Sequence, residues 1–249
     1  MGNNTSYPKP NTLNKLINKQ LLAALVLAIA TGLLIVLTNF SGFAVSLKLP
    51  PAKTHPLPPT LAQWQDNTNS GDYFSQIATT EVGYLVWSKF PVKVFIQRPT
   101  GINEQQAQVW FNSVLDTVQE WNDFLPLLVV ESSDLADITI ERKTPPLEFS
   151  REDRSPRARS ALTRYELYTL DHVLLHRVSI LLSPSQTGRY LLAASRHELG
   201  HALGIWGHSP LETDALYFSQ VRNSPFISHR DVNTLKRIYE QPTSLGFSY

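Results

Sequence analysis

The sequence predicts an α+β domain, and three observations support this prediction. Short runs of β-branched and aliphatic residues alternate with turn-forming residues, as in chains that form strands. Longer segments place apolar residues three and four positions apart, which is typical of amphipathic helices. About 190 residues follow residue 60, which is enough for one domain with a sizeable core. We therefore expect a small twisted sheet that packs against helices.

The expected elements can be placed along the chain. A helix begins at Glu104, because Asn103 is a good N-cap residue. A second helix covers Gln186–Gly204. The last helix follows Ser228, with Asp231 at the spacing of a capping box. Five short segments rich in β-branched residues are expected to be strands: Val92–Gln97, Leu127–Glu131, Asp137–Glu141, Arg164–Thr169 and Val173–Leu182.

The segment from residue 197 to residue 208 has the spacing of a metal site. On a helix, His197 and His201 lie four positions apart and share a face, where two imidazoles can bind one zinc ion. Glu198 is one position further round, close enough to take a proton from a water bound to that ion. Gly204 lets the helix end, so that His208 can return as a third ligand. The alternative is a helix whose histidines are ordinary surface residues.

These residues resemble the signature HExxHxxGxxH of the metzincin clan and, within it, of the matrixin family of zinc endopeptidases. The segment Ile227–Tyr239 also resembles the closing matrixin helix. Two features depart from the family. Gly207 occupies the usual third-ligand position, so the third histidine comes one residue late, and Leu216 lies where the family has a turn methionine. The residues that match the signature are His197, Glu198, His201, Gly204, His208 and Ser209.

The resemblance implies a bacterial-type, membrane-anchored metalloprotease with a metzincin-like fold. It implies one catalytic Zn²⁺ held by the three histidines, Glu198 as general base, and a peptide or protein substrate. The strand Arg177–Leu182 resembles the edge strand above the matrixin cleft, and Leu216 is expected to replace the methionine as an apolar floor. The expected substrate-binding residues are Leu181, Leu182, Leu216 and Tyr217.

Two other functions fit the same residues. A catalytically inactive matrixin-like domain could keep a structural zinc, or none, and bind partner proteins. The missing methionine and the displaced histidine motivate this alternative, whereas the intact Glu198 argues against it. A hydrolase that acts on a non-peptide amide would need the same residues.

The N-terminal region predicts a membrane anchor. Leu21–Leu37 is a run of 17 residues without a charge, and Lys9, Lys15 and Lys19 precede it. We expect a cytoplasmic tail over 1–20 and a single-pass signal anchor over 21–40, which would place the peptidase domain at 61–249 on the extracytoplasmic side. Removal as a signal peptide, followed by secretion, is the alternative. The proline-rich residues 41–60 are expected to form an extended spacer.

Composition excludes several kinds of partner. The chain has 22 basic and 21 acidic residues, so its charge gives no reason to expect nucleic acid. It has no cysteine, which excludes a disulfide-linked partner and a thiolate zinc ligand. Two further histidines, His172 and His176, fall on a strand candidate and are expected to be surface or packing residues.

Overall fold

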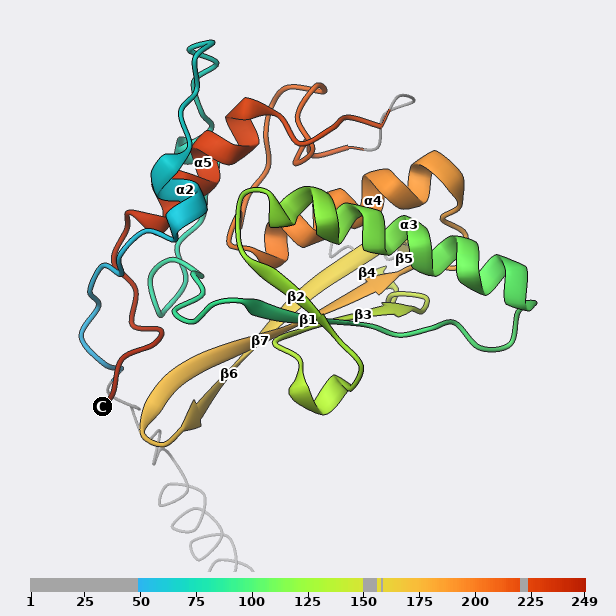
Figure 1. Ribbon diagram of the computed structural model, residues 1–249, viewed down its shortest axis with the longest axis horizontal. Coiled ribbons are helices and arrows are strands. Elements are labelled where there is room, and N and C mark those ends of the chain that lie inside the picture. Colours follow the sequence, from blue (N-terminus) through green and yellow to red (C-terminus); the bar gives the residue numbers. More distant parts are fainter. Residues whose placement is uncertain (1–48, 150–155, 158, 220–223) are drawn as a thin grey trace, which may run out of the picture. The chain divides into compact units, whose positions relative to one another are not determined.

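A computed structural model of the protein describes residues 49–149, 156–157, 159–219 and 224–249 (Figure 1). This part of the chain confirms the α+β prediction, since it contains a five-stranded mixed sheet and four α-helices. Residues 49–249 belong to one compact unit. The helices are α2 (Pro59–Gln63), α3 (Glu104–Asn122), α4 (Gly188–Ala202) and α5 (His229–Tyr239).

The sheet has the strand order β2-β1-β3-β7-β6. Neighbouring strands pair in parallel from β2 to β7, and β6 pairs antiparallel with β7 as a hairpin. All five expected strands are confirmed. A separate two-stranded sheet is formed by β4 (Glu148–Phe149) and β5 (Pro156–Arg157). The strands of the main sheet are β1 (Val92–Ile96), β2 (Leu127–Val130), β3 (Ile138–Arg142), β6 (Ala161–Leu170) and β7 (Val173–Leu182).

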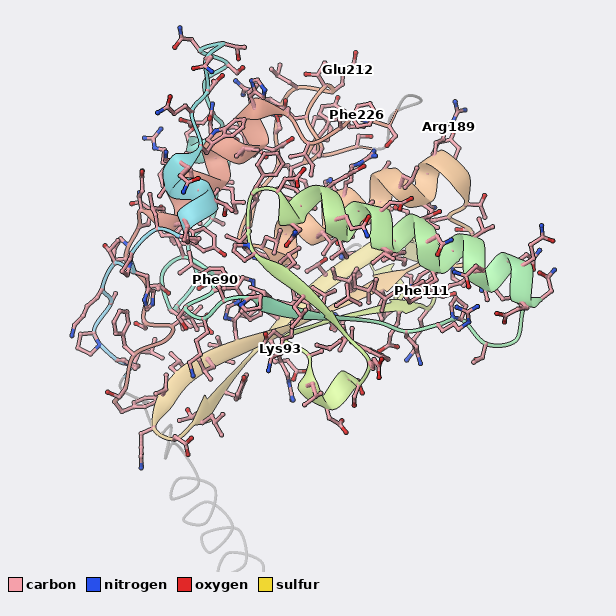
Figure 2. The ribbon with its side chains drawn as sticks, in the orientation of Figure 1. Phe90, Lys93, Phe111, Arg189, Glu212 and Phe226 are labelled. Atoms are coloured by element: carbon pink, nitrogen blue, oxygen red, sulfur yellow. The ribbon has the colours of Figure 1, made fainter. Side chains whose placement is uncertain are left out.

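Helices α3 and α4 cover one face of the sheet (Figure 1). The buried side of α3 includes Trp121, whose indole Nε1–H donates to the carbonyl of Arg196 in α4 at 3.0 Å. On β7, alternate residues such as Val178 and Ile180 are buried toward the helices, as the two-residue period of a strand requires. Lys93 of β1 lies on the opposite face (Figure 2). Helix α4, which carries His197 and His201, therefore packs directly on the sheet.

The helix ends confirm the expected caps. The Asn103 side chain accepts a hydrogen bond from the Gln106 amide at 2.8 Å at the start of α3. At the start of α5, the Ser228 hydroxyl accepts from the Asp231 amide, and the Asp231 carboxylate accepts from the Ser228 amide. Both bonds of a capping box are present, which fixes where α5 begins.

Residues 49–60 do not form the spacer that the proline content predicts. Lys53 pairs with Thr243 through two backbone hydrogen bonds of 2.9 and 3.0 Å. The ring of His55 stacks on Phe247, with centroids 4.4 Å apart, and bonds the carbonyl of Leu245 at 2.7 Å. Proline favours extended backbone, and here the C-terminal segment gives that backbone a pairing partner. Residues 49–60 therefore pack on the domain, and the compact unit begins at Leu49.

The prediction of a single-pass membrane protein is also corrected. Within the described residues, no helix is long and apolar enough to cross a membrane. The longest, α3, is amphipathic and carries charged residues such as Glu104 and Asp116 on its exposed side. The segment Leu21–Leu37, on which both anchoring and secretion depended, lies outside the described residues, as do the expected tail and anchor over 1–40.

His176 is a packing residue, as expected, whereas His172 lies exposed in the turn of the same hairpin. The His176 ring stacks on Trp87 with centroids 3.9 Å apart. Burial lowers the pKa of His176 to about 3, because the charged imidazolium would be cut off from water. Its neutral form therefore contributes stability above the unfolded-state pKa of 6.5, and this contribution is lost as the pH falls toward 3.

We expect the replacement His176→Leu to make the fold less sensitive to acid. Between pH 7 and pH 5 the parent should lose about 2 kcal/mol of unfolding free energy through this residue, and the variant should not. Urea unfolding at the two pH values measures the difference. His172→Asn, at the exposed turn position, serves as the control and should retain the parent's loss. An equal loss in parent and His176→Leu would contradict the assignment.

Candidate metal centre

Helix α4 places His197 and His201 on one face, and the chain returns after its end to place His208 beside them. Two of the ligand nitrogens, Nε2 of His197 and Nε2 of His201, are 3.1 Å apart. The metal-binding atoms of all three residues lie within 4.8 Å of one another. Tetrahedral zinc with bonds of 2.0–2.1 Å separates its ligand atoms by about 3.3 Å. The three expected ligands are therefore brought together, with the geometry of a metal site.

Hydrogen bonds to backbone carbonyls orient two of the rings. His197 Nδ1 lies 3.0 Å from the carbonyl of Ala215, and His201 Nδ1 lies 2.7 Å from the carbonyl of Ile205. A carbonyl only accepts, so each Nδ1 carries the proton and each Nε2 presents a lone pair. Two lone pairs that face each other at 3.1 Å repel unless a cation lies between them. The donor set therefore fits a metal ion.

Burial also keeps these imidazoles in the form that binds metal. Desolvation lowers the pKa of His197 and of His201 to about 4 each. Both rings are therefore neutral near pH 7, and the neutral ring is the metal ligand. This preference for the neutral form follows from the packing of α4 and needs no charged neighbour.

Packing at Gly207 explains why the third histidine comes one residue late. Gly207 pairs with Ile77, and the Trp206 carbonyl accepts from the Ala78 amide at 3.0 Å. A Cβ at position 207 would lie 2.2 Å from the backbone oxygen of Gln76. No side chain fits there, so the ligand has to come from the next position, which is His208.

Leu216 packs against helix α4 beside Gly200. Its side chain is fully buried, and a Cβ on Gly200 would come within 2.5 Å of its Cδ2 atom. Glycine at position 200 thus allows Leu216 to pack directly against the metal helix, as the apolar-floor hypothesis requires. Leu216 is fully buried and is not among the residues that line the cleft, and its expected substrate-binding role stays a prediction.

A buried carboxylate holds the turn that contains this floor. Asp231 of α5 accepts hydrogen bonds from the amide of Ala215 at 2.9 Å and from the hydroxyl of Tyr73 at 2.5 Å. The carbonyl of the same Ala215 orients His197. Asp231 therefore acts on the metal site through the backbone of one residue.

Glu198 faces a cleft beside the three histidines. The cleft holds about 580 Å³ of free space, part of it open to solvent, and His197, Glu198, Ala215 and Tyr217 contribute to its lining. Burial raises the pKa of the Glu198 carboxyl. The electrostatic effect of His197 and a hydrogen bond from Thr163 act in the opposite direction and lower it. Thr163 Oγ1 donates to Glu198 Oε2 at 2.5 Å. The residue that is expected to be the general base thus lines the cleft together with His197.

The expected substrate-binding residues are only partly placed at this cleft. Tyr217 lines it. Leu182 is fully buried in the sheet, and Leu181 lies on the other face of β7 by strand alternation. β7 is not an edge strand, because it pairs with β3 on one side and β6 on the other. The edge strand next to the cleft is β6, and the assignment of Arg177–Leu182 to that role is wrong.

The sequence reasoning also missed Arg196, which precedes the first ligand. Its guanidinium binds both carboxylate oxygens of Glu120 in α3 and donates to the carbonyl of Pro225 at 3.1 Å. It also stacks on Phe226, 4.9 Å from the ring centroid. Phe226 and Glu212 lie on the connection between α4 and α5 (Figure 2). Because Pro225 lines the cleft, the hydrogen bond from Arg196 connects this side of the cleft to helix α4.

Comparisons with known proteins leave the family open. No protein-family model matches this chain, and no curated protein matches its sequence. The resemblance to the metzincin clan rests on the sequence patterns described above.

Removal of the third ligand tests the metal site. We expect His208→Ala to lower zinc affinity by more than about 100-fold, since even the loss of a ligand's supporting hydrogen bond costs 10–100-fold. Competition with a coloured chelator at pH 7.5 measures the affinity. His229→Ala, which removes an exposed histidine outside the triad, is the control. Equal zinc affinity in the parent and His208→Ala would exclude His208 as a ligand.

A methyl group at Gly207 should disturb the fold and the site together. Gly207→Ala forces the loop away from the Gln76 carbonyl, so we expect a loss of about 1–3 kcal/mol in unfolding free energy. Zinc affinity should fall as well, because His208 is the next residue. Urea unfolding and chelator competition measure the two effects. Glu212→Ala, an exposed change in the same connection, should alter neither.

Proposed function

We propose that this protein is a zinc-dependent endopeptidase of the metzincin type, similar to the matrixins. The observation that carries the proposal is the cluster of three histidines, one of which, His197, lines the same cleft as the Glu198 carboxylate. A purely structural zinc site has no use for a carboxylate that faces the open position. The α+β fold with an edge strand beside the cleft supports the same proposal.

The metal is proposed to be zinc. His197, His201 and His208 would hold it, and three imidazoles with one open position are typical of catalytic zinc. When bound, a zinc ion lowers the pKa of its water to about 7 and polarises a carbonyl group. Because the expected ligands are nitrogen atoms of neutral rings, the donor set favours zinc over calcium or magnesium, which prefer oxygen.

Glu198 carries the proton through the reaction. Its carboxylate takes a proton from the attacking water while the water oxygen bonds to the scissile carbonyl carbon. It then gives this proton to the amine nitrogen as the carbon–nitrogen bond breaks. The buried position of Glu198 favours this cycle, because burial raises the pKa of its carboxyl toward the range in which a group can both accept and donate a proton.

The substrate is proposed to bind as an extended chain along β6. Among the described residues, β6 is hydrogen-bonded to β7 only, so its outer edge is available for strand addition. A peptide bound there would pass the cleft that Tyr217 and Pro225 help to line. Backbone hydrogen bonds would provide much of the affinity, and the cleft would select a side chain.

Cleavage of casein by the purified full-length chain, run beside Glu198→Gln, tests the function. We expect the variant to bind zinc as the parent does and to lose activity by about 10²–10⁴-fold, which is the usual contribution of a general base. Glu212→Gln, an exposed change, is the control. A folded, zinc-loaded parent that cleaves neither casein nor a peptide library would favour a non-catalytic binding domain. A folded parent without zinc affinity would overturn the proposal.

A further inference from the structure

Thr163 lies where the edge strand β6 contacts helix α4, which carries His197 and His201. It belongs to β6, in register with Ile180 of β7. Its side chain turns away from the outer face of the sheet and is 8% exposed, as is Glu198. Contact between α4 and β6 brings the two residues together. The strand that is proposed to hold the substrate therefore also touches the proposed base.

The contact is a directed hydrogen bond. Thr163 Oγ1 lies 2.5 Å from Glu198 Oε2 and 3.2 Å from the backbone carbonyl of Glu198. A hydroxyl has one proton to donate, and the closer carboxylate oxygen is the stronger acceptor. The bond therefore engages Oε2 of the carboxylate.

We propose that Thr163 is a positioning residue for the general base, holding the Glu198 carboxylate so that Oε1 faces the attacking water. The inference rests on the proposed function. Rotation about the last side-chain torsion of glutamate is broad, so a carboxylate without a partner samples many orientations. A fixed orientation removes that freedom before the reaction, and such positioning accelerates catalysis.

The hydroxyl also suits both halves of the proton cycle. With the carboxylate ionised, Thr163 donates to Oε2. With the proton on the carboxyl group, the hydroxyl can accept from it and donate to the carbonyl of Glu198, which is already within 3.2 Å. A methyl group in its place could do neither. The residue therefore supports the base without itself touching the substrate or the metal.

Thr163→Val, which has nearly the same shape, separates this role from packing. We expect kcat for a peptide substrate to fall about 10- to 100-fold, with KM within about twofold and zinc affinity unchanged. Thr163→Ser keeps the hydroxyl and should restore most of kcat. Thr139→Val, a half-buried change on the central strand β3, controls for loss of a strand hydroxyl outside the proposed substrate strand. Unchanged kcat in Thr163→Val, or no recovery in Thr163→Ser, would overturn the proposal.

A second measurement needs no activity. In the zinc-free chain, urea unfolding midpoints of Thr163→Val, Glu198→Gln and the double variant form a cycle. Non-additive shifts support the contact, and additive shifts overturn it. If the zinc-loaded parent cleaves no substrate, the proposed function fails and this role falls with it. If the parent cleaves normally and Thr163→Val does too, only the role of Thr163 fails.

Discussion

The buried carboxylate of Asp231 joins the parts of the chain that form the metal centre. Burying an ionised carboxylate is costly unless donors surround it. Here the donors are the amides of Ala215 and Ser228 and the hydroxyls of Tyr73 and Ser228. These residues come from three distant segments, so their positions depend on one another. Through the carbonyl of Ala215, the same network orients the ring of His197.

Two glycines allow close contacts on and after helix α4. Gly200 lets the side chain of Leu216 pack against the helix, and Gly207 lets the backbone of Gln76 approach the loop that follows it. Each departure from the matrixin signature lies at one of these contacts. Leucine is close to methionine in volume, so it can fill the floor. The shift to His208 follows from the absence of space at position 207. Both departures are therefore local adjustments around an unchanged pair of helix ligands.

Local patterns were enough to predict the elements and the cluster of three histidines, because both depend on residues close in sequence. The bounds of β7 and the start of α3 follow from alternation and capping, and the pair His197 and His201 follows from helix geometry. Strand order does not follow from local pattern, which is why β7 was mistaken for the edge. The pairing of Lys53 with Thr243 and the bond from Thr163 to Glu198 each join residues far apart. Such contacts leave no signal in a single sequence.

The pairing of β6 with β7 holds this edge strand in place. Its 10 residues pair with β7 along their whole length, from Ala161 opposite Leu182 to Leu170 opposite Val173. A peptide that paired with the outer edge of β6 would bind a strand whose other edge is already hydrogen-bonded to β7. The strand therefore resists displacement, and Thr163 keeps its place against Glu198 while the substrate binds. In the proposed function, the two sides of β6 have separate tasks, since the outer edge would bind the substrate and the inner face holds Glu198 through Thr163.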